Sequence, residues 1–190
     1  MSAGNATAAP VPNPDRFLKP GELHFGGKGE CISTMLGSCV SLTVWHPALR
    51  IGGMCHYLLP TRRGGNESQQ AGTYADEAMA VFVEAMKRHG TRPSEYQAKM
   101  FGGANMFPDI PVPPSRDVGA KNIEVGRELL RIFGMQLVGE HVGGVGHRRV
   151  LLDLASGDVW VKQVSEALAP NWAALTLPDF GNEGEREWKK

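Results

Sequence analysis

Cys39 and His56 belong to the two residue types that act together in thiol catalysis, and they lie seventeen positions apart. The residues around them alternate between apolar and polar types, as half-buried strands do. A hairpin with a four-residue loop over His46–Leu49 would pair Trp45 with Arg50, and the same register places Cys39 directly opposite His56. Opposed side chains share one face of a sheet, with Cβ atoms about 4.5–5.5 Å apart. We therefore expect a thiol beside an imidazole that lowers the pKa of the thiol.

The turn before Cys39 and the hydroxyl groups upstream of it could complete such a site. Gly37 and Ser38 form a turn whose backbone N–H groups could face a developing oxyanion. Ser33 and Thr34 lie on a candidate strand, where alternation allows only one of them to face the Cys39 side. That residue would orient the imidazole, and the pattern leaves open which of the two it is.

Two glycine-rich segments later in the chain are weaker candidates. Gly102 and Gly103, followed by Asn105, either bring backbone close to a substrate or oxyanion or simply form a turn. The segment Gly143–Gly146 lacks the Gly-Lys-Ser/Thr of a phosphate-binding loop and does not begin a helix, which favours an ordinary turn.

The alternative interpretation of Cys39 is an ordinary buried thiol, and this is the one favoured for Cys31 and Cys55. On the hairpin register, the face opposite to Cys39 is typical of a protein core. Its members are Val40, Leu42, Val44, Ile51 and Cys55. Three cysteines without an export signal predict reduced thiols rather than a disulfide framework.

Composition and charge argue against several classes of function. The 20 Lys and Arg residues balance 20 Asp and Glu residues, which argues against nucleic acid and anionic membranes as partners. No apolar run approaches the ~18 residues of a membrane-spanning helix, and the first residues do not resemble a secretory signal. The histidines form no HxH or HExxH pattern. We expect a cytoplasmic protein with neither metal nor organic cofactor.

The periodicities predict a layered α/β domain over residues 17–169, between a disordered leader (1–16) and a tail (170–190) of undecided structure. Helices are expected over Tyr74–His89, with Thr73 as N-cap, and over Gly119–Phe133. Strands are expected over Cys31–Leu36, from Val40 to Trp45, Ile51–Leu59, Gln97–Phe101, Gln136–Gly139, Val150–Leu154 and Val159–Val161.

An ordered set of sequence motifs extends through most of the chain. The set begins with Thr34-Met-Leu-Gly-Ser-Cys-Val40 and Ile51-Gly-Gly-Met-Cys-His-Tyr-Leu-Leu-Pro60. It continues with Tyr74-Ala-Asp-Glu-Ala, Ala98-Lys-Met-Phe-Gly-Gly-Ala-Asn-Met106, Gly119-Ala-Lys-Asn122, Val142-Gly-Gly-Val-Gly-His-Arg-Arg-Val150 and Ser156-Gly-Asp-Val159. Taken in order from about Gly21 to Val161, these motifs resemble the CheD family of chemoreceptor glutamine deamidases.

The resemblance implies an α/β/α sandwich of mixed strands, akin to the deamidating bacterial toxins, and an amidohydrolase that converts receptor glutamines to glutamates with release of ammonia. It implies Cys39 as nucleophile and His56 as base, without a cofactor. The family's third residue is a Thr six positions before the Cys, where this chain has Ser33, with Thr34 next to it. A methylesterase side activity and a CheC-type phosphatase partner are further expectations. The alternatives are a non-catalytic adaptor and a different Cys/His acyl hydrolase.

Overall fold

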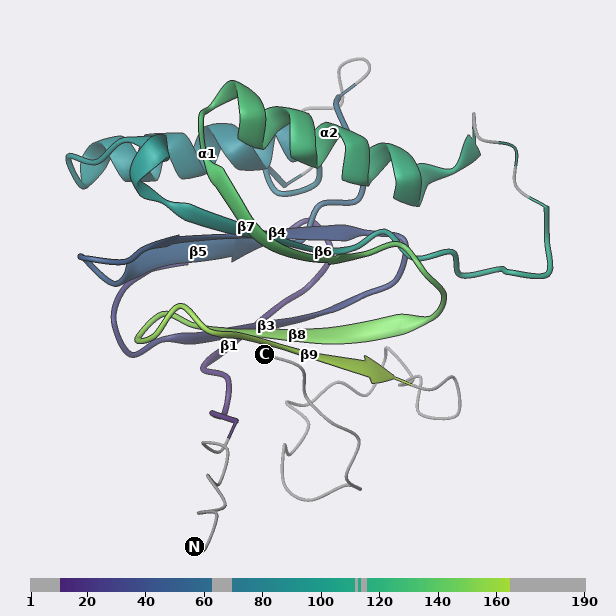
Figure 1. Cartoon of the computed structure of the whole chain (residues 1–190), viewed down its shortest axis with the longest axis horizontal. Helices are drawn as coiled ribbons and strands as arrows, with labels where there is room; N and C mark the ends of the chain where they lie inside the picture. The colour runs from purple at the N-terminus through teal and green to yellow at the C-terminus, as the bar shows by residue number, and fades with distance from the viewer. Residues whose placement is uncertain (1–10, 63–69, 112, 114–115, 165–190) are drawn as a thin grey trace, which may run out of the picture.

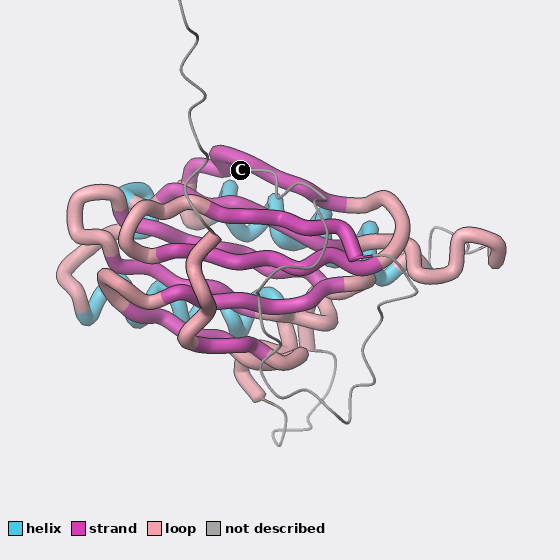
Figure 2. Tube along the Cα trace, turned by 90° about the horizontal axis from the view of Figure 1, so that it is seen from below, coloured by secondary structure: helices cyan, strands magenta, loops and turns pink. Residues whose placement is uncertain are grey.

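The computed structural model describes residues 11–62, 70–111, 113 and 116–164. Two mixed β-sheets lie one on the other, and both helices cover the far side of the five-stranded sheet (Figure 1). Figure 2, seen from the side of the four-stranded sheet, shows the helices behind both sheets. The predicted α/β class is confirmed, and the layers among these residues run helix, sheet, sheet.

Each sheet combines antiparallel pairs with one parallel pair. The four-stranded sheet has the order β1-β3-β8-β9 and consists of β1 (Arg16–Leu18), β3 (Cys31–Leu36), β8 (His147–Asp153) and β9 (Val159–Val164). The five-stranded sheet has the order β2-β5-β4-β6-β7 and consists of β2 (Leu23–Gly26), β5 (Ile51–Cys55), β4 (Val40–His46), β6 (Gln97–Gly102) and β7 (Gln136–Val142). The parallel pairs are β1 with β3 and β6 with β7.

The two predicted long helices are present as α1 (Ala75–Arg88) and α2 (Val118–Ile132), and a short 3-10 helix spans Pro93–Glu95. Beyond α1, Gly90 takes the left-handed conformation that ends a helix, with φ of +70°. The predicted N-cap of α1 is wrong. Tyr74 occupies that position in extended conformation without a side-chain cap, and the first turn carries Asp76 and Glu77 instead.

Folded structure begins just before the expected domain boundary. Asp15 exchanges hydrogen bonds with Cys31, since its N–H donates to the Cys31 carbonyl and its carboxylate accepts from the Cys31 N–H, both over 2.8 Å. Strand β1 then starts at Arg16. The first ten residues of the expected leader and the tail 170–190 lie outside the described residues.

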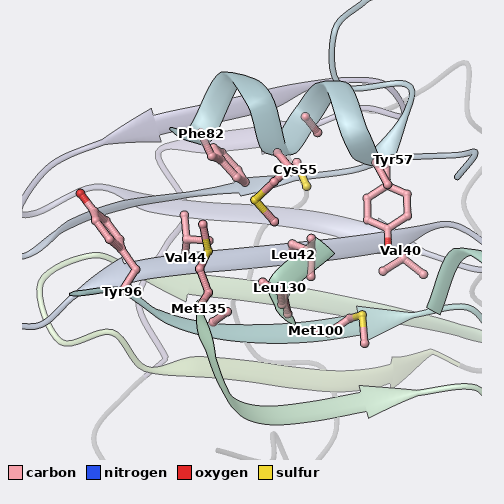
Figure 3. Close-up of a cluster of buried hydrophobic side chains, with 14 of the residues drawn as sticks. Val40, Leu42, Val44, Cys55, Tyr57, Phe82, Tyr96, Met100, Leu130 and Met135 are labelled. Carbon is pink, nitrogen blue, oxygen red and sulfur yellow. The ribbon is translucent and has the colours of Figure 1, made fainter. Parts of the chain in front are cut away.

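Strand β4 separates two apolar clusters. One face contributes Val40, Leu42 and Val44 to the cluster between the five-stranded sheet and the helices, which also contains Cys55 and is drawn in Figure 3. From the other side of the strand, Cys39 and Trp45 pack against the cluster between the two sheets. The predicted core face is therefore confirmed, as is the burial of Cys31 and Cys55 with free thiols.

The β4–β5 register differs by two residues from the predicted one. Thr43 pairs with Met54 and His46 with Ile51, so the loop is Pro47–Arg50 rather than His46–Leu49. Arg50 closes this loop with φ of +53° and donates its N–H to the His46 carbonyl over 2.8 Å. Cys39 and His56 are therefore not directly opposed. A shift of two preserves which residues share a face, so both still face the four-stranded sheet.

The assigned core predicts that truncating two different phenylalanines to alanine has very different effects on the free energy of unfolding. Phe82 is fully buried on α1, whereas Phe107 is 65% exposed. We expect Phe82→Ala to lower the free energy of unfolding by about 3–5 kcal/mol, because it removes contacts and leaves a cavity. Phe107→Ala should change it by about 0.5 kcal/mol at most. Urea denaturation of both variants measures this, and equal effects would contradict the assigned core.

Candidate active site

A hydrogen bond between the two sheets forms the centre of the candidate site. Thr34 lies on β3 in the four-stranded sheet, and His56 follows β5 in the five-stranded sheet. Thr34 Oγ1 and His56 Nδ1 are 2.7 Å apart, and both residues are buried. The backbone of His56 is also fixed, because its N–H donates to the Glu22 carbonyl and its carbonyl accepts from the Gly21 N–H.

The Thr34 hydroxyl determines which nitrogen of His56 carries the proton. Thr34 Oγ1 donates to the Leu18 carbonyl over 2.8 Å, and a carbonyl oxygen only accepts. The single hydroxyl proton is thereby used, so His56 Nδ1 must donate its own proton to Thr34 Oγ1. In the neutral ring, Nε2 then carries the lone pair. This is the tautomer that a base acting through Nε2 requires.

Burial keeps the His56 ring neutral. Removal from water lowers its pKa from 6.5 to about 4, and a backbone hydrogen bond to Leu18 opposes this only in part. At neutral pH the ring is therefore an uncharged hydrogen-bond acceptor at Nε2.

No group of three or more His, Cys, Asp or Glu side chains that could hold a metal ion occurs within the described segments.

Cys39 precedes β4 and is partly exposed, with a free thiol. Burial raises the pKa of this thiol, although its own backbone N–H lowers it slightly. The expected lowering of the thiol pKa by the imidazole is therefore wrong for the resting protein. A neutral imidazole supplies no positive charge, and desolvation disfavours the thiolate. The resting pair is a neutral thiol and a neutral imidazole.

Cys39 and His56 flank the last pair of the β4–β5 ladder. Val40 and Tyr57 form that pair, with reciprocal N–H···O distances of 3.0 and 2.9 Å. Cys39 and His56 each precede one member, so they are diagonal neighbours on one face of the sheet. The Cβ atoms of such neighbours lie about 7 Å apart, within reach of a long or aromatic side chain.

Of the predicted residues Gly102, Gly103 and Asn105, the two glycines lie beside the Gly37–Cys39 turn, and Gly103 supports it. Gly103 donates its N–H to the Cys39 carbonyl over 2.7 Å, and Ala104 donates to the Gly37 carbonyl over 2.9 Å. The Asn105 N–H donates to the Gly144 carbonyl. The N–H groups of Gly103 and Asn105 are thus already engaged.

Gly102 and Gly103 are needed for this close approach. Both have positive φ, and an added Cβ on Gly102 would lie 2.2 Å from the Cys39 carbonyl oxygen. By contrast, the N–H groups of Ser38 and Cys39 have no oxygen acceptor among the described residues.

The structure distinguishes between the two hydroxyl candidates. Thr34 shares the inter-sheet face of β3 with Ile32 and Leu36, which belong to the inter-sheet cluster. Ser33 therefore points to the opposite face, because successive residues alternate. Its Oγ is buried and has no hydrogen-bond partner among the described residues. Thr34 is the hydroxyl residue that contacts His56.

Two groups at the site were not among the sequence candidates. The Leu18 carbonyl belongs to a strand of three residues and, being backbone, leaves no signal in the sequence. Asn122 is fully buried on α2 and donates its side-chain N–H to the Leu58 carbonyl over 2.8 Å. A polar residue next to the apolar stripe of an amphipathic helix was the available signal.

Comparison with known proteins identifies the family. The family model for CheD, described as chemotactic sensory transduction, matches residues 58–163. A probable chemoreceptor glutamine deamidase CheD 3 of Dechloromonas aromatica is 48% identical over 155 residues, which cover 82% of this chain and 91% of that protein. The chain belongs to the CheD family.

Other relatives have the same kind of name. Proteins named probable chemoreceptor glutamine deamidase from Chromobacterium violaceum and Albidiferax ferrireducens are each 44% identical over 151 residues. They cover 80% and 79% of this chain, which covers 78% and 87% of them, respectively. Among solved structures, the hypothetical protein YfiH of Bacillus licheniformis has a TM-score of 0.41 and 14% identity, covering 65% of this chain and 49% of its own. No helix among the described residues is long and apolar enough to cross a membrane.

The neutral, buried imidazole predicts a pH dependence of stability. The pKa of His56 is about 4 in the folded protein and 6.5 without burial, so the unfolded chain binds the proton more readily. The contribution of His56 is fully present above pH 6.5 and is lost as the pH falls toward 4, amounting to about 3 kcal/mol. Denaturation between pH 7 and pH 4 measures this, with His56→Gln as the control that should lose this part of the slope. A ring resonance of His56 that titrates near pH 6.5 would contradict the assignment.

Proposed function

We propose that this chain deamidates glutamine side chains of chemoreceptors, with Cys39 as nucleophile, His56 as base and Thr34 as the residue that orients the imidazole. The names of the relatives support the reaction and its receptor substrates. The observation that carries the residue assignment is the Thr34–His56 hydrogen bond, which leaves Nε2 free to accept a proton on the face that Cys39 shares.

The first step makes a tetrahedral intermediate. As Cys39 Sγ attacks the carboxamide carbon of glutamine, the thiol proton passes to His56 Nε2 and the carbonyl π electrons move to oxygen. The N–H groups of Ser38 and Cys39, which lack an oxygen acceptor in the described part of the chain, are positioned to bind this oxyanion. Because thiol and imidazole both start neutral, charge develops only as the substrate reacts.

The intermediate then collapses with release of ammonia. The imidazolium gives its proton to the amide nitrogen, the C–N bond breaks, and a thioester to Cys39 remains. Water attacks the thioester, with His56 Nε2 accepting one water proton. The C–S bond breaks, the thiol regains a proton and the product is glutamate. No step requires a metal or an organic cofactor.

The same acyl chemistry extends the proposal in two directions. A glutamate methyl ester presents a similar carbonyl to Cys39, so a methylesterase side activity follows from the same steps, with methanol in place of ammonia. Because the proposed substrates are the cytoplasmic domains of chemoreceptors, we propose that the protein acts in the cytoplasm. A CheC-type phosphatase is the proposed signalling partner.

A non-catalytic adaptor is the competing function, and one observation favours it. Burial raises the pKa of Cys39, as in a thiol without a catalytic role. The deamidase proposal differs in requiring proton transfer to His56 during attack rather than a resting thiolate. Turnover therefore decides between the two functions, and the resting reactivity of the thiol does not.

The direct test is peptide mass spectrometry of a purified chemoreceptor cytoplasmic fragment after incubation with the protein. We expect a gain of about one mass unit at particular glutamines, with ammonia released in equal amount. Cys39→Ala should abolish the gain, because no acyl-enzyme forms without the thiol. Cys31→Ala should retain it, since Cys31 is a buried thiol near Asp153. Receptor binding without any mass gain would support the adaptor, and turnover by Cys39→Ala would exclude the mechanism.

The two hydroxyl residues provide a second test. Thr34→Val keeps the side-chain shape but removes the acceptor for His56 Nδ1, so we expect kcat to fall about 10–100-fold. Ser33→Ala is the matched control on the opposite face of β3, and its rate should stay within about twofold. Steady-state ammonia release measures both variants. A larger loss in Ser33→Ala than in Thr34→Val would assign the orienting role to Ser33.

A further inference from the structure

The β4–β5 ladder opens at the point where the candidate site begins. After the pair Val40–Tyr57, the next hydrogen-bonded partners in this register would be Ser38 and Leu59. Leu59 instead donates its N–H to the Thr73 carbonyl over 3.2 Å and accepts from the Ala75 N–H over 3.0 Å. The chain after Tyr57 has turned toward the start of α1. Ser38 has therefore lost its ladder partner.

Asn122 supplies the hydrogen-bond donor that the Ser38 carbonyl lacks in the open ladder. Its Nδ2 donates to the Leu58 carbonyl over 2.8 Å and, through a longer contact of 3.5 Å, to the Ser38 carbonyl. Both neighbours are carbonyls, so the amide nitrogen must face them, and Oδ1 is left buried without a partner among the described residues. The backbone carbonyl of Asn122 also accepts from the Tyr57 hydroxyl over 2.7 Å. One residue thus joins α2 to both strands.

Close packing of α2 brings Asn122 to this place. An added Cβ on Gly119 would lie 2.7 Å from the Gly103 carbonyl oxygen. An added Cβ on Gly126 would lie 2.5 Å from the Tyr57 hydroxyl. Only glycine permits both approaches, and Asn122 lies between the two contact points. The asparagine is fully buried there.

The contact to Ser38 has a consequence for Cys39, because the Ser38 carbonyl and the Cys39 N–H belong to the same planar peptide group. In a trans peptide these two groups point in opposite directions. Helix α2 lies on one side of the five-stranded sheet, and the four-stranded sheet lies on the other (Figure 1). A carbonyl held toward α2 directs the Cys39 N–H to the opposite side, where the Cys39 side chain packs.

We propose that Asn122 is a positioning residue of the oxyanion hole: by holding the Ser38 carbonyl, it aims the Cys39 N–H at the oxygen of the substrate carboxamide. This inference rests on the proposed function, because an oxyanion forms only if Cys39 attacks a carbonyl. Asn122 itself touches neither the substrate nor the thiol. Because the nitrogen is directed at two carbonyls, Oδ1 stays buried without a partner in the described part of the chain.

The test compares two reactions of the same thiol. Deamidation passes through an oxyanion, whereas alkylation of Cys39 by iodoacetamide is a displacement at carbon that forms none. Asn122→Leu keeps the volume without the donor, and Asn122→Ser removes the reach of the side chain. In both variants we expect kcat for a receptor cytoplasmic fragment to fall about 10–100-fold, less than or comparable to the loss of an oxyanion donor itself. KM should change by less than about threefold, and the alkylation rate by less than about twofold.

Both rates are expressed per folded protein, because an unfolded fraction would be alkylated without deamidating and would change their ratio. Leu130→Ala is the matched control, since Leu130 is buried on the same helix and its side chain has no hydrogen-bond donor for the two carbonyls. Its ratio should equal that of the wild type. A ratio of deamidation rate to alkylation rate that is unchanged in both Asn122 variants overturns the inference, and this includes the case in which both rates fall in parallel. Absence of deamidation by the wild-type protein overturns instead the proposed function.

Discussion

The site depends on one hydrogen bond that joins the two sheets, from His56 Nδ1 to Thr34 Oγ1. Neither group reaches water, so each needs its partner to avoid the cost of an unpaired buried polar group. The bond can form only if β3 and β5 keep both their separation and their rotation about the strand axes. The Leu18 carbonyl, which accepts the Thr34 proton, fixes the direction of the bond. The tautomer of the candidate base is thus a property of how the sheets pack.

A second constraint is the divergence of two strands beyond Val40 and Tyr57. A complete ladder would engage both the N–H and the carbonyl of Ser38, so the Ser38 N–H would not be available to a ligand. Leu59 instead bonds to the segment before α1, so those bonds are absent and the backbone that precedes β4 is left open on this side. Gly103 and Ala104 then support the turn from the β6 side through the carbonyls of Cys39 and Gly37. The turn is held by its carbonyls, and the N–H groups of Ser38 and Cys39 have no oxygen acceptor within the described segments.

Sequence patterns located most of this fold, and their errors have physical causes. Alternation in β4 and β5 assigned the faces, so Cys39 and His56 were placed together although the register differed by two. Register depends on how the loop closes. Arg50 closes it in a left-handed conformation, for which an arginine in the sequence is no signal. Strands β1 and β2 have three and four residues, too few for a periodicity to be visible. The choice between Ser33 and Thr34 depends on which face of β3 meets the other sheet, which is a tertiary fact.

Burial of the site has opposite effects on its two titrating groups, and together they define the resting state. Desolvation lowers the pKa of His56 and raises that of Cys39, so both shifts favour the uncharged pair over thiolate and imidazolium. A resting ion pair would need stabilising charges, and a neutral pair needs only the hydrogen bonds already described. Neutrality also makes the thiol a weak target for oxidants and metals, since both react with the thiolate. Attack on a carboxamide changes this balance only if donors are aimed at the oxygen where negative charge appears. In the proposed reaction, the orientation of the Ser38–Cys39 peptide, rather than the acidity of the thiol, is then the property of this site that matters most for turnover.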